Sequence, residues 1–194
     1  SSAASDVYKR QFQDQNRAVS LHPHNASALT ARGVARAAMG DTQWALNDLD
    51  QACALAPNLP EAFFQRGKAR LGLEMHAEAL ADFERVIELA PDTAPVYVVR
   101  GDTFMAMEEY WQAVADYDRA IELQPKNAPT HFARGRARLA LREYRRAIDD
   151  FDRTLELEPA FAPALANRGS AYEKVGEYEQ AIRDLDRAIA LDPE

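Results

Sequence analysis

Residues 94–127 read APVYVVRGDTFMAMEEYWQAVADYDRAIELQPKN, and this stretch decides the fold. Its Arg-Gly pair recurs at one fixed interval along the chain, at Arg32-Gly33, Arg66-Gly67, Arg100-Gly101, Arg134-Gly135 and Arg168-Gly169. Six prolines keep the same interval, at Pro23, Pro57, Pro91, Pro125, Pro159 and Pro193. A strict period of this length is typical of proteins built from stacked repeats, which offer a long binding surface and usually no catalytic pocket.

Each repeat has the pattern of an antiparallel helix pair. In the quoted repeat we expect a first helix from about Pro95 to Met107, because proline is tolerated in a first turn. Apolar residues at helical spacing predict a second helix from about Trp111 to Gln124, which Pro125 ends. Gly101 lies inside the first helix, where glycine costs roughly 1 kcal/mol relative to alanine. Its recurrence in every repeat therefore predicts a close approach of the two helices.

The same pattern places the start of every helix and predicts no strand. The first helices should start near Ser27, Glu61, Pro95, Pro129 and Pro163, and the second helices near Gln43, Ala77, Trp111, Arg145 and Glu179.

This spacing resembles the tetratricopeptide repeat (TPR), a helix-turn-helix motif of the same period. The resemblance rests on a small residue in the second helix and a large residue four positions later. The small residues are Ala45, Ala79, Ala113, Ala147 and Ala181, and the large ones are Leu49, Phe83, Tyr117, Phe151 and Leu185. The chain departs from the family by carrying arginine before each glycine, where leucine is usual, and Arg36 where a tyrosine is expected.

The resemblance implies an all-α fold, a right-handed α-solenoid of five repeats with a partial repeat before them. The partial repeat spans 12–25 and contributes only a second helix, and the array of 26–194 divides into 26–59, 60–93, 94–127, 128–161 and 162–194. Residues 1–11 share nothing with the repeat and resemble translated sequencing-adapter read-through; a natural N-terminal segment is the alternative. Because no terminal cap follows the fifth repeat, we expect a fragment of a longer array.

Composition narrows the function classes. A net charge of -8 argues against nucleic-acid binding, which needs a basic face. No apolar run is long enough to cross a membrane, so no membrane span is expected. The four histidines are dispersed, the single cysteine, Cys53, takes an apolar helix position, and no glycine-rich phosphate loop is present. We therefore expect no catalytic residue, no cofactor and no metal site, and a protein that is not an enzyme.

An aspartate follows each Arg-Gly arginine at one constant spacing, at Asp48, Asp82, Asp116, Asp150 and Asp184. These positions predict an ion pair between the two helices of every repeat, with N–O distances within about 4 Å. The alternative is that both sets of charges are solvated. Metal binding by Asp48 with Asp50 is disfavoured, because residues two apart on a helix point in different directions.

The resemblance also places a set of first-helix residues in the concave groove, and these are the candidate partner-binding residues. They comprise the apolar rows Phe64, Val98, Phe132 and Leu71, Met105, Leu139, with Lys68, Asp102 and Arg136 between the rows. An apolar stripe with sparse charges suits a helical or extended peptide. The alternative is that these residues pack one first helix on the next.

One TPR subclass binds the C-terminal carboxylate of heat-shock proteins with a clamp of lysine, asparagine and arginine. By resemblance the matching positions in the first three repeats are Thr30, Val34, Gln65, Pro95 and Val99, which do not make the clamp. Moving the window by one or two repeats does not produce it either. A heat-shock-protein partner is therefore not expected.

The leading hypothesis is a non-enzymatic scaffold that binds a peptide or protein segment in the concave groove. One alternative is a structural scaffold that self-associates end to end, because Ile182, Leu185 and Ile189 should be partly exposed on the last helix. Another is a docking array of a larger enzyme whose catalytic domain lies outside this chain.

Overall fold

The computed structural model describes residues 13–192. Within that range the chain forms helices and short turns, with no strand. The all-α prediction is therefore confirmed. Residues 1–12 and 193–194 lie outside the description, and with them the segment 1–11 for which a non-native origin is predicted.

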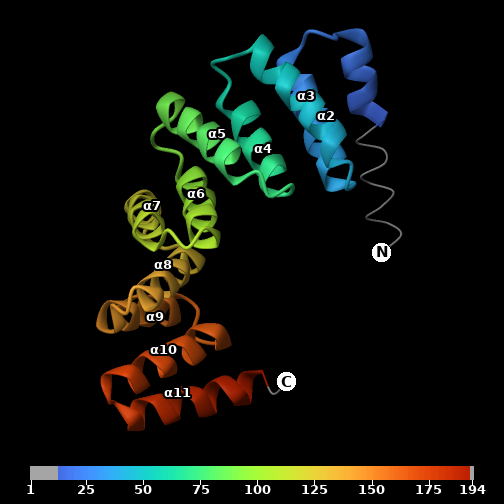
Figure 1. Cartoon of the computed structure of the whole chain (residues 1–194). Helices are drawn as coiled ribbons and strands as arrows, with labels where there is room; N and C mark the ends of the chain where they lie inside the picture. The colour runs from blue at the N-terminus through green and yellow to red at the C-terminus, as the bar shows by residue number, and fades with distance from the viewer. Residues whose placement is uncertain (1–12, 193–194) are drawn as a thin grey trace. The chain divides into compact units, whose positions relative to one another are not determined.

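The chain divides into two compact units, 1–92 and 93–194, and each is described by itself. In the first unit residues 13–21 are helical, as predicted for the partial repeat. They are followed by α2 (Ala26–Ala38), α3 (Thr42–Leu55), α4 (Pro60–Leu71) and α5 (His76–Leu89). The second unit contains α6 (Ala94–Ala106), α7 (Tyr110–Leu123), α8 (Ala128–Ala140), α9 (Tyr144–Leu157), α10 (Ala162–Val175) and α11 (Tyr178–Leu191) (Figure 1).

The helices from α2 to α11 form the five predicted pairs, each joined by a short turn. Every one begins a single residue before its predicted start. In α6, α8 and α10 the proline therefore takes the second helical position, where its missing N–H again costs no intrahelical hydrogen bond. The second helices end as predicted before a proline: Gln124, which precedes Pro125, has left the helical region with φ -136° and ψ 77°.

One backbone feature recurs in every turn that joins a helix pair. Gly40 and Gly176 have φ of 88° and 83°, and the equivalent Glu74, Glu108 and Arg142 have φ of 58°, 61° and 61°. Glycine adopts this left-handed region freely, whereas a side chain costs about 1–2 kcal/mol there. The turn therefore imposes one backbone conformation on a position whose residue type varies.

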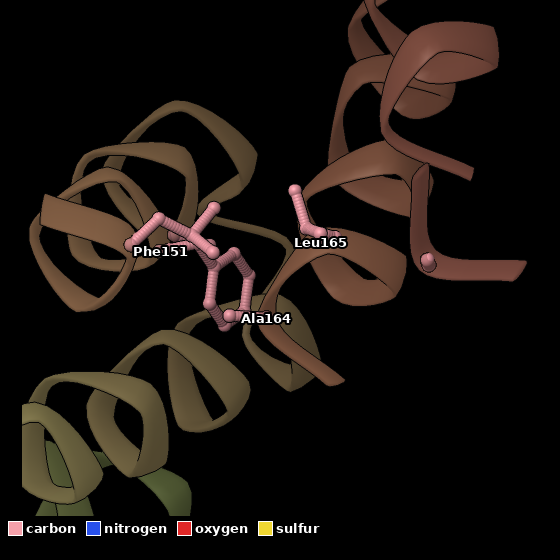
Figure 2. Close-up of a cluster of buried hydrophobic side chains, with 6 residues drawn as sticks. Phe151, Ala164 and Leu165 are labelled. Carbon is pink, nitrogen blue, oxygen red and sulfur yellow. The ribbon is translucent and has the colours of Figure 1, made fainter. Parts of the chain in front are cut away.

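The mid-helix glycines allow the two helices of each repeat to approach closely, as predicted. A Cβ atom on Gly67 would lie 2.5 Å from Cε1 of Phe83, and one on Gly135 would lie 2.6 Å from Cε1 of Phe151. The large second-helix residue thus fills the space that the glycine leaves. In the second unit Phe151 packs with Ala164 and Leu165 of the next repeat in a buried cluster (Figure 2).

Candidate functional site

The five Arg-Gly arginines all pair with the predicted aspartates. The shortest N–O distances are 2.6 Å for Arg32–Asp48, Arg66–Asp82, Arg100–Asp116 and Arg168–Asp184, and 2.5 Å for Arg134–Asp150. All five aspartates are buried and hydrogen-bonded to the guanidinium. The ion-pair prediction is confirmed, and the alternative of solvated charges is wrong.

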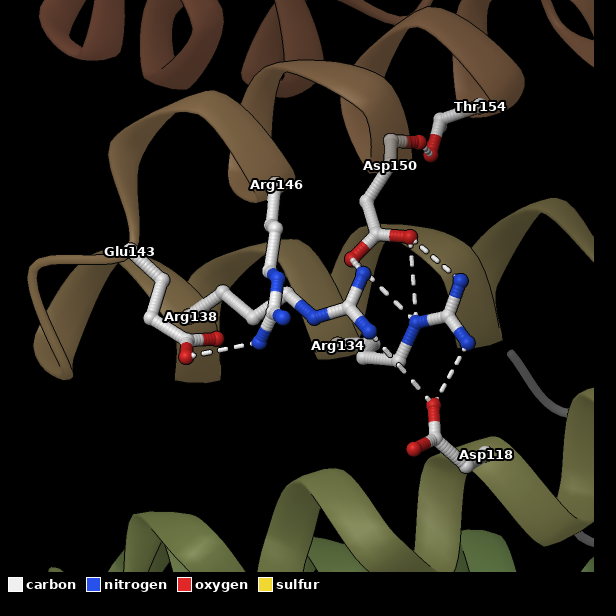
Figure 3. Close-up of polar contacts among 7 residues, drawn as sticks. All are labelled: Asp118, Arg134, Arg138, Glu143, Arg146, Asp150 and Thr154. Carbon is white, nitrogen blue, oxygen red and sulfur yellow. Dashed lines mark hydrogen bonds and ion pairs between the residues drawn. The ribbon is translucent and has the colours of Figure 1, made fainter.

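Several of these ion pairs belong to a larger network of charges, which the sequence analysis did not predict. Asp150 also accepts a hydrogen bond of 2.8 Å from Arg138, one helical turn beyond Arg134. Arg134 in turn reaches back 2.6 Å to Asp118 on α7, in the preceding repeat (Figure 3). A visible signal was available, because Asp118 precedes Arg134 by the same number of residues by which Asp150 follows it.

The same geometry recurs in other repeats. A second arginine reaches the buried aspartate in Arg36–Asp48 and Arg70–Asp82, and the link to the preceding repeat recurs in Arg66–Asp50 and Arg168–Asp152. These arginines are therefore held by the fold, and the side chains left to contact a partner must be sought elsewhere on the first helices.

The nine candidate partner-binding residues lie on three first helices, and none is buried. In the first unit α4 carries Phe64, Lys68 and Leu71; in the second, α6 carries Val98, Asp102 and Met105, and α8 carries Phe132, Arg136 and Leu139. The three charged residues are exposed and the six apolar ones are half-buried. Half-burial means that the apolar residues serve the fold with one side and are accessible on the other.

The two phenylalanines illustrate this double role. Phe64 packs against Phe83 at a ring separation of 6.1 Å, and Phe132 packs against Phe151 at 5.9 Å. On each helix a cation lies over the same ring, Lys68 over Phe64 at 5.6 Å and Arg136 over Phe132 at 6.0 Å. Cation–π attraction of this kind orients the charged side chain along the helix surface.

Two pockets open between successive first helices, one in each unit. The pocket of the first unit, here the Lys68 pocket, has a volume of about 320 Å³ and is lined by Val34, Ala37, Ala38, Thr42, Leu49, Gln65, Lys68, Ala69 and Gly72. The pocket of the second unit, here the Asp102 pocket, has a volume of about 450 Å³ and is lined by Asp102, Met105, Ala106, Tyr117, Ala133 and Arg136. Four of the nine candidate residues thus line a pocket: Lys68, Asp102, Met105 and Arg136.

The Asp102 pocket contains a buried hydroxyl that the sequence pattern did not single out. Tyr117 is 1% exposed, and its hydroxyl donates a hydrogen bond of 2.7 Å to Oδ1 of Asp102. Partial removal from water raises the pKa of Asp102, while the Tyr117 hydrogen bond and the charge of Arg136 oppose that rise. Burial, together with the hydrogen bond to Asp102, raises the pKa of Tyr117, so the phenol remains a donor at neutral pH.

Other chemically reactive groups serve the core. Cys53 is buried in the first unit, as predicted, and burial raises the pKa of its thiol to about 11. His131 is buried, with Nε2 3.0 Å from the carbonyl oxygen of Pro125. Residues 13–192 contain no cluster of histidine, cysteine and acidic side chains that could hold a metal ion. No helix in that range is both long and apolar enough to cross a membrane.

Helix pairs that recur at one fixed interval, each closed by a glycine contact and an interhelical ion pair, define an all-α helical-repeat protein. Models of the tetratricopeptide repeat match residues 60–93 and 162–194, and a TPR repeat model matches 101–141. Together these matches cover more than half of the chain, which belongs to the tetratricopeptide repeat family.

Solved structures of TPR proteins share the fold. YrrB, described as a TPR protein with an unusual peptide-binding site, matches with a TM-score of 0.82 and 22% identity over 93% of each chain. MamA from Desulfovibrio magneticus RS-1 matches with a TM-score of 0.81 and 18% identity, over 87% of this chain and 95% of that one. MamA MSR-1 matches with a TM-score of 0.76 and 26% identity, over 87% of this chain and 97% of the MamA chain. Among curated proteins, none matches the chain.

Proposed function

A TPR array is a protein–protein interaction scaffold, and we propose that this one is non-enzymatic and binds a peptide or protein segment on its first helices. The observation that carries the proposal is the pair of pockets at equivalent places in the two units, each containing candidate residues that the fold leaves accessible. A half-buried apolar row beside an exposed charge suits a peptide whose anchors bury while its backbone stays solvated. The peptide-binding site described for YrrB, which has a similar fold, supports the same class of partner.

The test compares two triple variants of the whole chain. Lys68, Asp102 and Arg136, each changed to Ala, remove the exposed charges between the two apolar rows. None of the three is itself buried, and Asp102→Ala also removes the acceptor of the Tyr117 hydroxyl. The matched control changes the exposed second-helix residues Glu88, Glu122 and Glu156 to Ala. Peptides are selected from a displayed random library on the wild-type protein, and their affinities are then measured by fluorescence anisotropy.

We expect the first-helix variant to lose at least about tenfold in affinity, because a hydrogen bond to a charged group contributes about 1.5–3 kcal/mol. The control variant should bind like the wild type. Equal peptide affinity of both variants and the wild type would contradict binding on the first helices. Failure to select any peptide would contradict it as well.

A second candidate function is self-association through α11. Ile182 and Ile189 are 59% and 63% exposed, whereas the equivalent Ile148 and Leu155 of α9 are 7% and 8% exposed. Positions that are buried on α9 are thus open to solvent on α11, and an exposed apolar patch favours association with a second copy. Sedimentation equilibrium of the wild type and Ile189→Lys tests this: a monomer in both cases at high micromolar concentration counts against it.

A further inference from the structure

The two pockets are copies of one position in the repeat, and their chemistry differs. They lie two repeats apart, so that Leu49 and Tyr117 form equivalent floors and Lys68 and Arg136 supply an equivalent cation. Three further lining positions differ: Val34 of the Lys68 pocket corresponds to Asp102, Ala37 to Met105 and Gln65 to Ala133. The Asp102 pocket therefore contains a carboxylate and a hydroxyl at places where the Lys68 pocket has only hydrocarbon.

The Tyr117 hydroxyl is not required by the helix packing. Phe83 and Phe151 occupy the same repeat position, and both are 0% exposed. A Cβ atom on the facing glycine would lie 2.5 Å from the Phe83 ring, 2.8 Å from the Tyr117 ring and 2.6 Å from the Phe151 ring, so the hydroxyl adds nothing to that contact. What it adds is the 2.7 Å hydrogen bond to Oδ1 of Asp102, which holds the carboxylate at the pocket wall.

The fixed carboxylate shares its pocket with a cation that is held in place as well. Arg136 lines the same pocket, and its guanidinium lies over the ring of Phe132. A carboxylate has about four acceptor sites, so Asp102 can accept further hydrogen bonds beside the one from Tyr117. The pocket thus offers both an acceptor and a donor, with a combined charge of about zero.

This arrangement discriminates among side chains by charge. A lysine or arginine anchor would be attracted by Asp102 and repelled by Arg136, and an acidic anchor would meet the reverse. A carboxamide is neutral and carries both an N–H₂ donor and a C=O acceptor. It can donate to Asp102 and accept from Arg136 at the same time, so that no buried polar group is left without a partner.

We propose that the Asp102 pocket binds the carboxamide side chain of a glutamine or asparagine in the partner peptide. The proposal rests on the proposed function and names the anchor that one of its pockets selects. Tyr117 acts as a positioning residue for Asp102, and Asp102 and Arg136 are the residues that contact the anchor.

The experiment uses a displayed library of random peptides, selected in parallel on the wild-type chain, on Tyr117→Phe and on Asp102→Val. Tyr117→Phe removes only the hydroxyl and installs the residue that other repeats already carry. Asp102→Val installs the residue of the equivalent Lys68 pocket. Circular dichroism checks that both variants fold. The best wild-type peptide is then resynthesised with its glutamine or asparagine replaced by leucine, glutamate or lysine.

On the wild type we expect enrichment of glutamine or asparagine at one peptide position, and about a tenfold loss of affinity on each replacement, because an unmatched buried polar group is penalised. Asp102→Val should abolish the enrichment, and Tyr117→Phe should weaken it, while both variants still select peptides. Selected peptides without such enrichment, or an enrichment that survives Asp102→Val, overturn the carboxamide assignment and leave peptide binding intact. If the wild type selects no peptide at all, the proposed function fails and this assignment fails with it.

Discussion

The carboxylates of Asp150 and Asp118 both pair with Arg134, but their side chains are 2% and 45% exposed. The charge of the buried Asp150 must be neutralised by the protein, whereas water can solvate the charge of Asp118. Removing Asp150 would leave Arg134 and Arg138 without the buried carboxylate that both contact.

We therefore expect Asp150→Ala to destabilise the protein by up to about 3–5 kcal/mol, the cost of breaking a buried ion pair, because Arg134 and Arg138 keep only the exposed Asp118 as a partner. Asp118→Ala should cost less than about 1 kcal/mol, as is usual for exposed ion pairs. Urea unfolding followed by circular dichroism measures both. Similar losses for the two variants would contradict the distinction between buried and exposed partners.

A second residue-scale prediction concerns the mid-helix glycines. Gly67→Ala gains up to about 1 kcal/mol of helix propensity but places its Cβ against the Phe83 ring, and overpacking of this kind costs about 1–3 kcal/mol. We expect net destabilisation. Gly72→Ala is the control, since its Cβ would meet only ordinary contacts of 3.4 Å or more. Thermal unfolding should show a lower melting temperature for Gly67→Ala alone; a rise in both variants would mean that the ring yields.

At the scale of the element, we predict a stabilising substitution in the turn that joins the two helices of a pair. Glu108 has φ of 61° in a position where Gly40 and Gly176 stand in other repeats. Replacing Glu108 by glycine removes about 1–2 kcal/mol of left-handed strain and adds about 0.4–1 kcal/mol of unfolded-state entropy. Glu108→Gly should thus raise the free energy of unfolding by about 0.5–1 kcal/mol, measured in urea, and Gly40→Ala should lower it. A destabilised Glu108→Gly would show that the glutamate side chain contributes more than its backbone costs.

The last helix gives a second element-scale prediction. Ile148 on α9 and Ile182 on α11 occupy the same repeat position but are 7% and 59% exposed. Ile148→Lys should cost several kcal/mol, because it places an unpaired ammonium at a buried position. Ile182→Lys should change stability by no more than about 0.5 kcal/mol, as is usual for surface substitutions. Differential scanning calorimetry at low protein concentration compares the two, and a large loss for Ile182→Lys would place that residue in an unrecognised contact.

For the whole molecule, the two units suggest a test of independent folding. The second unit contains three complete helix pairs, with the Arg134 and Arg168 bridges between neighbouring repeats inside it. About three repeats are needed for a stable array. A fragment of residues 93–194 should therefore be helical by far-ultraviolet circular dichroism and unfold cooperatively in urea. A spectrum of an unfolded chain would show that the unit needs the rest of the protein.

The nine candidate residues could be named from the sequence because the resemblance to the TPR family implies which first-helix positions face the groove. Which of the nine line a pocket and which only pack against neighbouring helices could not be predicted from the sequence. Phe132 and Arg136 lie one turn apart on the same helix, yet only Arg136 lines the Asp102 pocket. That outcome depends on the side chains of the neighbouring helices, which no local pattern specifies.

The sequence by itself determined the helix pairs, the glycine contacts and the pairing of each Arg-Gly arginine with the aspartate on the second helix of its own repeat. These features recur with the period, and each follows from the spacing of residues within one repeat. Only the tertiary structure decided that Arg134 also reaches Asp118 and that the Tyr117 hydroxyl reaches Asp102. Both contacts depend on the depth and angle at which neighbouring helices pack, and these are set by the volumes of all the side chains between them.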